Sequence, residues 1–167
     1  MKKYFPELIT GFVVGVLNTV GFFRSISCCL LIPLAVIFAI FLHKKSTGKT
    51  NDYDISEGIF IGFITALFAA FFATFFEVTV TFIFKSNDLV NSIDEIYAFV
   101  KDFPQTPPIQ DMLKQFDKMV IEITEYGFSL KYTVLLLINN ILGYTVFGIL
   151  GGLLGTKLIN KKNQNLS

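Results

Sequence analysis

Long apolar runs separated by short polar stretches dominate the chain. Four such runs lie at residues 5–23, 26–42, 58–84 and 132–159. A helix that crosses the roughly 30 Å hydrocarbon core of a bilayer needs about 20 mainly apolar residues. The pattern therefore predicts four transmembrane helices. The second is short for this task, and the third and fourth are long enough to tilt or to project beyond the bilayer.

The segment 85–131 has a different pattern, because its apolar residues recur at the spacings of three and four that are typical of amphipathic helices. Possible cap residues at 86–88 precede a first helix, which the proline-rich stretch 103–108 interrupts. A second helix is predicted from Pro108 to about Gly127. The predicted fold class is thus all-α: a polytopic membrane protein with four transmembrane helices and an extracytoplasmic amphipathic helical hairpin between spans three and four.

Two interpretations of this helical hairpin remain open. In the first, the lipid surface or the ends of the spans cover its apolar faces. In the second, these faces form a lid or a docking platform for a partner protein. Acidic residues outnumber lysines in the segment, so attraction to anionic lipid does not explain its position.

Lysines close to the ends of the spans predict the orientation, because such residues concentrate on the cytoplasmic side. In the four-span arrangement one side carries Lys2, Lys3, Lys44, Lys45, Lys49, Lys157, Lys161 and Lys162. Both termini are therefore expected to be cytoplasmic, and residues 1–167 are expected to form a single membrane domain.

The composition excludes several classes of protein. Hydrophobic residues make up 53% of the chain and charged residues 16%, whereas a soluble domain has about 25% charged residues. One His, two adjacent Cys and a formal net charge of +1 argue against a His/Cys metal cluster, a disulfide framework and a nucleic-acid binder. No phosphate-binding loop, nucleophile elbow or metalloprotease motif is present, so we expect neither an enzyme nor a cofactor.

Small residues form rows at helical spacing on three of the predicted spans. Such rows let helix backbones approach one another in lipid. They are Gly11 and Gly15 on the first span, Gly58, Gly62 and Ala66 on the third, and Gly148, Gly151, Gly152 and Gly155 on the fourth. Either packing within one chain or contacts in a homo-oligomer would explain them.

Polar residues within the spans suggest one candidate site. By their distance from the span ends, the following share the outer half of the membrane or its boundary: Asn18, Arg24, Cys28, Cys29, Glu77, Asn139 and Asn140. They form either a polar cluster beneath the amphipathic segment or separate interhelical contacts, with the asparagines hydrogen-bonded between helices and Glu77 paired with Arg24.

Three other polar positions have simpler explanations. Glu7 lies within about one turn of the cytoplasmic end, where Lys2, Lys3 or Lys157 could neutralise it. His43 is expected to be an interfacial residue. The two cysteines could bind a soft metal, carry a lipid or undergo redox chemistry, but small apolar core residues are the simpler interpretation.

The spans also carry a resemblance. It rests on Gly11-Phe-Val-Val-Gly15, Cys28-Cys29-Leu-Leu-Ile-Pro-Leu-Ala, Lys44-Lys45, Glu57-Gly58-Ile-Phe-Ile-Gly62 and Gly148-Ile-Leu-Gly-Gly-Leu-Leu-Gly155. With these landmarks the chain resembles a loosely defined group of small bacterial four-span membrane proteins of unknown function. The resemblance implies location in the bacterial inner (plasma) membrane and assigns no catalytic or binding residue.

Two functional hypotheses follow from the sequence. The first is a structural or accessory component of a membrane assembly, in contact with the lipid bilayer and with a membrane-protein partner or further copies of itself. The second is a small transporter or oligomeric channel that uses the outer polar cluster.

Overall fold

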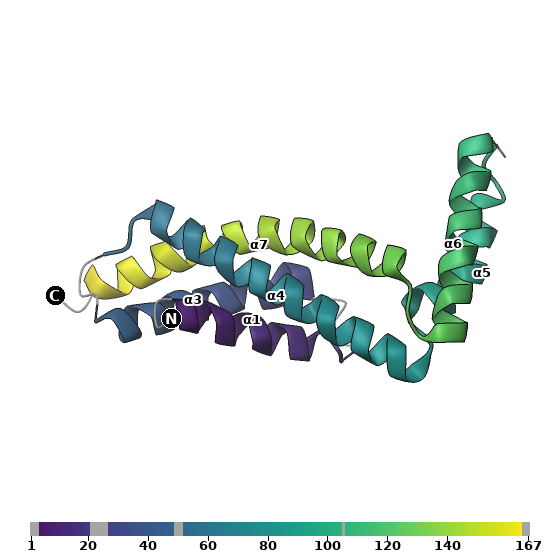
Figure 1. Cartoon of the computed structure of the whole chain (residues 1–167). Helices are drawn as coiled ribbons and strands as arrows, with labels where there is room; N and C mark the ends of the chain where they lie inside the picture. Colours follow the sequence, from purple (N-terminus) through teal and green to yellow (C-terminus); the bar gives the residue numbers. More distant parts are fainter. Residues whose placement is uncertain (1–3, 21–26, 49–51, 105, 165–167) are drawn as a thin grey trace. The chain divides into compact units, whose positions relative to one another are not determined.

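The structure is a computed structural model that describes residues 4–20, 27–48, 52–104 and 106–164. Of these residues 88% are helical, and none of them lies in a strand. The elements, shown in Figure 1, are α1 (Phe5–Leu17), the π-helical turn η2 (Ser27–Leu31), α3 (Ile32–Thr47), α4 (Ile55–Phe84), α5 (Asp88–Val100), α6 (Pro107–Tyr126) and α7 (Leu130–Gln164). The predicted all-α class is confirmed.

Three helices are long and apolar enough to cross a membrane. They are Cys29–Thr47, Ile55–Phe84 and Leu130–Lys161. The chain is therefore a candidate membrane protein with three such helices in the described residues. These helices overlap the predicted runs 26–42, 58–84 and 132–159. Each helix extends beyond at least one end of its predicted run.

The first predicted span, 5–23, is described only as far as residue 20, and it stays a prediction. Helix α1 ends at Leu17 after 13 residues, which is about 20 Å of helix and short of a full span. Beyond Leu17, the hydroxyl and the backbone N–H of Thr19 both donate to the carbonyl of Val16. The rest of the predicted span lies partly in residues 21–26, outside the described residues.

The chain divides into two compact units. The bundle unit comprises Met1–Phe76 and Leu137–Ser167, and the second unit comprises Glu77–Leu136. Helices α4 and α7 contribute to both units, because each crosses the boundary between them.

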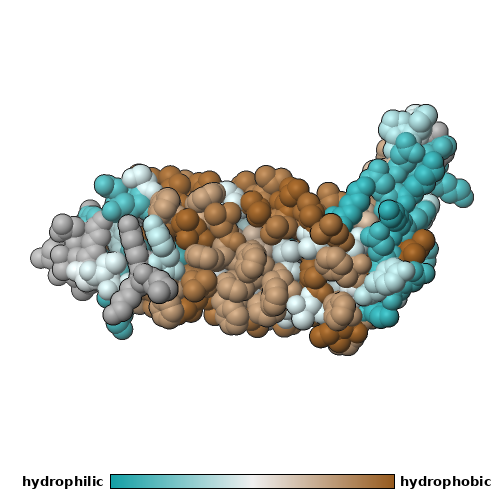
Figure 2. Space-filling model, viewed as in Figure 1, coloured by the Kyte–Doolittle hydropathy of each residue, from teal (hydrophilic) through white to brown (hydrophobic). Residues whose placement is uncertain are grey.

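In the bundle unit, apolar residues form both the core and the surface. The core includes Val36, Ile40 and Ala70, while Phe71 and Leu142 are 57% and 65% exposed. Figure 2 shows apolar side chains over these helices and hydrophilic ones near the end where the C-terminus lies. An apolar surface of this extent suits contact with lipid rather than water.

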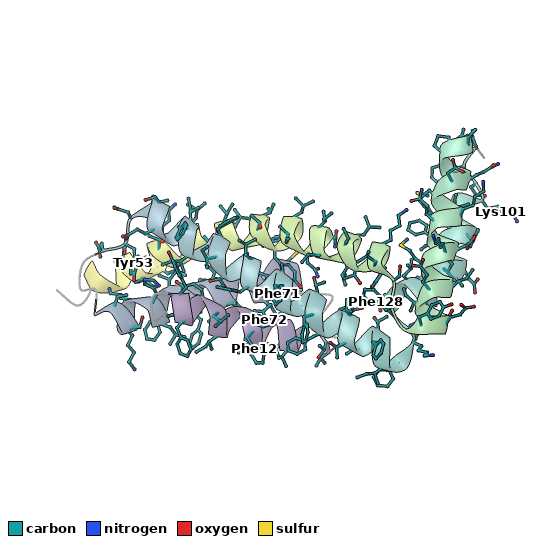
Figure 3. All side chains as sticks on the ribbon, viewed as in Figure 1. Phe12, Tyr53, Phe71, Phe72, Lys101 and Phe128 are labelled. Atoms are coloured by element: carbon teal, nitrogen blue, oxygen red, sulfur yellow. The ribbon has the colours of Figure 1, made fainter. Side chains whose placement is uncertain are left out.

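Glycines bring α1 close to α4, and α3 close to α7. A Cβ atom on Gly15 would lie 2.5 Å from Cβ of Phe72 in α4, closer than side chains can pack. The ring centroids of Phe12 and Phe72 lie 5.2 Å apart in an edge-to-face arrangement. Both residues are labelled in Figure 3. On α7, a Cβ atom on Gly151 would lie 2.7 Å from Cα of Pro33 in α3.

Helices α4 and α7 contact each other directly through their backbones. A Cβ atom on Gly62 would overlap the carbonyl of Gly148, and one on Gly152 would overlap the carbonyl of Gly58. Together with the contacts above, these place the predicted small-residue rows against other helices of the same chain, in the manner expected of helices packed in lipid. The other residues of these rows also contact neighbouring helices: Gly11 contacts Phe68, Ala66 contacts Gly148, and Gly155 contacts Ile37 and Ile40.

The second unit contains the two amphipathic helices that the sequence predicts. The side chain of Asn87, one of the predicted caps, accepts the N–H of Val90 at 3.0 Å, and α5 follows. Helix α6 starts at Pro107, one residue before the predicted start, and ends at Gly127 with φ 75°. The two helices contact each other, and the Tyr97 hydroxyl of α5 donates to Asp117 of α6.

Candidate functional site

Asn18 and Asn140, two members of the predicted outer polar cluster, each form an interhelical hydrogen bond. Asn18 caps α1 and is 7% exposed, and its Oδ1 accepts the hydroxyl of Tyr144 at 3.2 Å. Asn140 donates from Nδ2 to Oγ1 of Thr74 at 3.0 Å. Each asparagine thus joins α7 to a different helix, α1 in one case and α4 in the other.

Asn139 and Cys29 lie on the surface instead. Asn139 precedes the buried Asn140, and successive residues of an α-helix point about 100° apart, so only one of the two faces the core. Cys29 is an exposed thiol in η2, at the start of the apolar helix Cys29–Thr47, so the interpretation of it as a core residue is wrong. The side chain of Cys28 and all of Arg24 are outside the described residues.

Glu77 belongs to the second unit and is buried there. It is 5% exposed, and the Tyr132 hydroxyl lies 3.5 Å from its Oε1. The predicted pairing with Arg24 falls outside the described residues and stays a prediction. The described members of the cluster therefore make separate contacts, Asn18 with Tyr144, Asn140 with Thr74 and Glu77 with Tyr132, and Asn139 is exposed.

A different pair, Glu7 and His43, forms a close contact between ionisable side chains in the bundle unit. Oε1 of Glu7 lies 2.6 Å from Nδ1 of His43. Glu7 is in the first turn of α1 and His43 near the end of α3, so the contact between these two helices brings them together. Glu7 is 0% exposed, so its carboxylate is buried within the bundle. Of the lysines predicted to neutralise it, Lys2 and Lys3 lie outside the described residues, and Lys157 is exposed.

The pairing of Glu7 with His43 was not predicted from the sequence. The available signal was topological. In a helical hairpin the first turn of one helix and the last turn of the other lie at the same end, so Glu7 and His43 were placed to meet. Burial was not readable from the sequence, since it depends on α4 closing over the pair.

Glu7 and His43 line a cavity of about 460 Å³ at the lysine-rich end of the bundle. The other lining residues are Tyr4, Thr47, Tyr53, Glu57, Phe60, Ile61 and Ile64. The rings of Tyr4 and Phe60 lie 6.4 Å apart, as do those of His43 and Tyr53. The cavity thus has a buried acidic part and an aromatic, partly exposed rim.

Two hydrogen bonds from the side chain of Asn160 hold the backbone of Tyr53 beside this cavity. Asn160 of α7 accepts the N–H of Tyr53 at 3.0 Å and donates to its carbonyl at 2.9 Å. Tyr53 lies in the segment before α4, where no helical hydrogen bonds are available to its backbone. Its side chain is labelled in Figure 3 and is 4% exposed.

Two carboxylates, Glu7 and Glu57, line the cavity, and His43 lies beside the first of them. Oε2 of Glu7 has no hydrogen-bond partner among the described residues, and leaving a buried acceptor unsatisfied costs about 1–3 kcal/mol. In the part of the chain that the structure describes, no group of three His, Cys, Asp or Glu is placed to hold a metal ion.

Comparisons with known proteins do not identify a relative. No family model matches the chain, and neither the curated proteins nor the solved structures include a match. The resemblance to small four-span bacterial membrane proteins therefore stays a prediction.

Proposed function

We propose that this protein is a structural or accessory component of a membrane assembly in the bacterial inner membrane. In this proposal α1 and the following residues complete a fourth crossing, both termini are cytoplasmic, and the second unit is extracytoplasmic. The lysine distribution supports the orientation, and the three long apolar helices support the membrane location.

The pairing of polar side chains in the bundle carries the proposal. A transport path needs polar groups that line a wet cavity, whereas Asn18 and Asn140 are bonded to Tyr144 and Thr74 and neither lines the cavities around Glu7 or between α1 and α3. In lipid such pairs stabilise helix association, because an unpaired amide would be costly there. These residues therefore act as interhelical contacts.

The second unit supplies a surface for a partner. On α5 and α6, Phe99 is 69% exposed and Tyr126 is 68% exposed. Large aromatic side chains are enriched at the centres of protein interfaces. A membrane-protein partner or another copy of the chain that covers them would gain apolar contact.

Gentle detergent extraction followed by mass spectrometry of co-migrating proteins tests this proposal. We expect a stoichiometric partner or a homo-oligomer with the wild type, and its loss with Phe99→Ser and Tyr126→Ser combined. Lys101→Ala, at an exposed polar position of the same unit, is the matched control and should retain the complex. A lone monomer in the native extract would contradict the proposal.

Burial of Glu77 favours the alternative, a small transporter or oligomeric channel. A carboxylate that is 5% exposed in a long apolar helix is a common feature of ion and proton pathways. If the protein transports a solute, Glu77→Gln should change flux into reconstituted vesicles. Unchanged flux with intact helix content would remove the reason for this alternative.

A further inference from the structure

A pocket between α6 and the first two turns of α7 lies within the second unit. Its volume is about 530 Å³. Four of its lining residues share one face of α6 and four come from the start of α7: Gln115, Lys118, Met119, Glu122, Leu130, Lys131, Val134 and Leu135. All eight belong to the described residues. Each charge that lines the pocket therefore has a described position.

The polar part of this lining carries a formal charge of +1. Lys118 and Lys131 each contribute an ammonium group, and Glu122 contributes one carboxylate. The Oε2 atom of Glu122 accepts the hydroxyl of Ser129 at 2.6 Å, so this carboxylate is engaged with the segment between the two helices. A ligand with a single negative charge would neutralise the lining.

Among the described residues, the contacts of both ammonium groups leave N–H donors for such a ligand. Nζ of Lys118 lies 4.0 Å from Oε1 of Glu122, which is an ion pair beyond hydrogen-bond distance. Lys131 donates to the side-chain carbonyl of Gln115, and an ammonium group has three donors in total. The remaining donors complement the oxygens of a phosphate group.

The apolar part of the lining is exposed. Leu130 is 67% exposed, Val134 is 46% exposed and Leu135 is 48% exposed. These residues begin the helix Leu130–Lys161, which is long and apolar enough to cross a membrane. A small soluble anion would leave these side chains uncovered, whereas the hydrocarbon chains of a lipid would cover them.

The position of Lys131 along α7 matches the level of lipid headgroups. Lys157 lies 26 residues later on the same helix, a distance of about 39 Å along the helix axis. A bilayer is about 40–45 Å thick when its headgroup regions are included. With the two lysines in opposite headgroup regions, the apolar residues between them cross the hydrocarbon core. The pocket then lies beside the headgroups of one leaflet.

We propose that this pocket binds a phospholipid of the surrounding bilayer. The phosphodiester, with its single negative charge, lies between Lys118 and Lys131, and the acyl chains begin against Leu130, Val134 and Leu135. The attraction is local, because the second unit as a whole carries more acidic residues than lysines. The lining residues include neither of the aromatic side chains proposed above to meet a partner protein, so the lipid site does not depend on that partner.

Native mass spectrometry of the full-length protein in detergent tests the proposal with three probes. Phosphatidylglycerol has acyl chains and a phosphodiester, diacylglycerol with the same chains lacks the phosphate, and glycerophosphoglycerol lacks the chains. We expect phosphatidylglycerol to bind about tenfold more tightly than either, the factor that one charge-assisted hydrogen bond supplies. Equal binding of diacylglycerol would overturn the proposal. Equal binding of glycerophosphoglycerol would indicate a site for a soluble phosphate and would overturn it as well.

Two double variants locate the binding. Lys118→Gln combined with Lys131→Gln should weaken the binding of phosphatidylglycerol about tenfold. Lys101→Gln combined with Lys114→Gln removes the same charge from the same unit outside the pocket, and should leave binding unchanged. All four lysines are exposed, so the fold should tolerate both combinations.

Two outcomes with these variants would overturn the proposal. An equal loss of binding in both would indicate a general attraction of the lipid to surface charge. The variant at Lys118 and Lys131 can instead dissociate an oligomer in lipid-free detergent without any lipid preference in the wild type. That result would assign the two lysines to a contact between copies of the chain.

Discussion

Asn160 and Tyr53 are 107 residues apart in the sequence, yet the side chain of Asn160 forms hydrogen bonds with both the backbone N–H and the carbonyl of Tyr53. The contact ties the segment before α4 to the end of α7. It replaces the hydrogen bonds that a helix would have provided, so the Tyr53 ring has a defined position although its backbone is irregular.

Replacing Asn160 should therefore destabilise this end of the bundle. Asn160→Ala removes both hydrogen bonds, and we expect it to lower the free energy of unfolding by about 1–3 kcal/mol. Thermal unfolding followed by circular dichroism in detergent measures the change. Lys157→Ala, one turn earlier and exposed, is the control. Equal effects of the two substitutions would argue against a stabilising role for the hydrogen bonds between Asn160 and Tyr53.

The contact between α4 and α7 should not tolerate an added methyl group. A Cβ atom at Gly148 would lie 2.7 Å from Cβ of Ala66, so Gly148→Ala should cost about 1–3 kcal/mol through overpacking. Leu150→Ala, on the exposed side of α7, serves as the comparison. If Gly148→Ala unfolds at the same temperature as wild type, the close backbone approach is wrong.

The hydrogen bond between Asn140 and Thr74 should contribute modestly to stability. Such bonds between membrane helices are worth about 0.6–2 kcal/mol. A double-mutant cycle with Thr74→Val and Asn140→Ala is expected to show coupling of this size. Asn139→Ala, at the exposed neighbour, should show no coupling with Thr74→Val.

Tyr97 should titrate at unusually high pH. Its hydroxyl donates to Asp117, at 2.6 Å from Oδ1, and this hydrogen bond raises the pKa of Tyr97 above its usual value of about 10. The stabilisation is complete below about pH 10 and is lost as the pH rises through the raised pKa. Ultraviolet titration of tyrosinate, with Tyr97→Phe to identify the signal, measures this pKa.

Asp117→Asn provides the control for Tyr97. This variant keeps a hydrogen-bond acceptor but removes the negative charge, so the pKa of Tyr97 should fall toward about 10. An unchanged titration curve would show that the tyrosine does not contact Asp117.

The proposed topology predicts opposite labelling at two lysines. In a background without Cys28 and Cys29, an impermeant thiol reagent should label Lys101→Cys in intact cells and Lys45→Cys only after permeabilisation. Both positions are exposed, so accessibility within the protein does not limit the reaction. The reverse pattern would invert the orientation, and labelling of both in intact cells would contradict a crossing between them.

The sequence predicted elements better than contacts. Hydrophobic runs and small-residue spacing indicated the long helices and the surfaces that pack, and the Asn87 cap and Gly127 bounded the amphipathic helices. The apolar run 5–23 continues past the end of α1 at Leu17, and hydropathy alone does not show where a helix ends within such a run.

The candidate site was less accessible from the sequence. Depth along a helix placed Asn18 and Asn140 at a similar level, but the direction in which each side chain points decides its partner. Tyr144 and Thr74 were not predicted as partners, since a tyrosine or a threonine in an apolar helix carries little signal alone. The pairing of Glu7 with His43 depends likewise on how three helices meet.

The arrangement of glycines on α7 also bears on the order in which the protein assembles during biosynthesis. Gly148 and Gly152 contact α4, while Gly151 contacts α3, so one helix closes against two that are synthesised earlier. Until α7 has been synthesised, Gly58 and Gly62 of α4 lack the helix that contacts them in the folded chain. The segment between α4 and α7 sets the length of this interval.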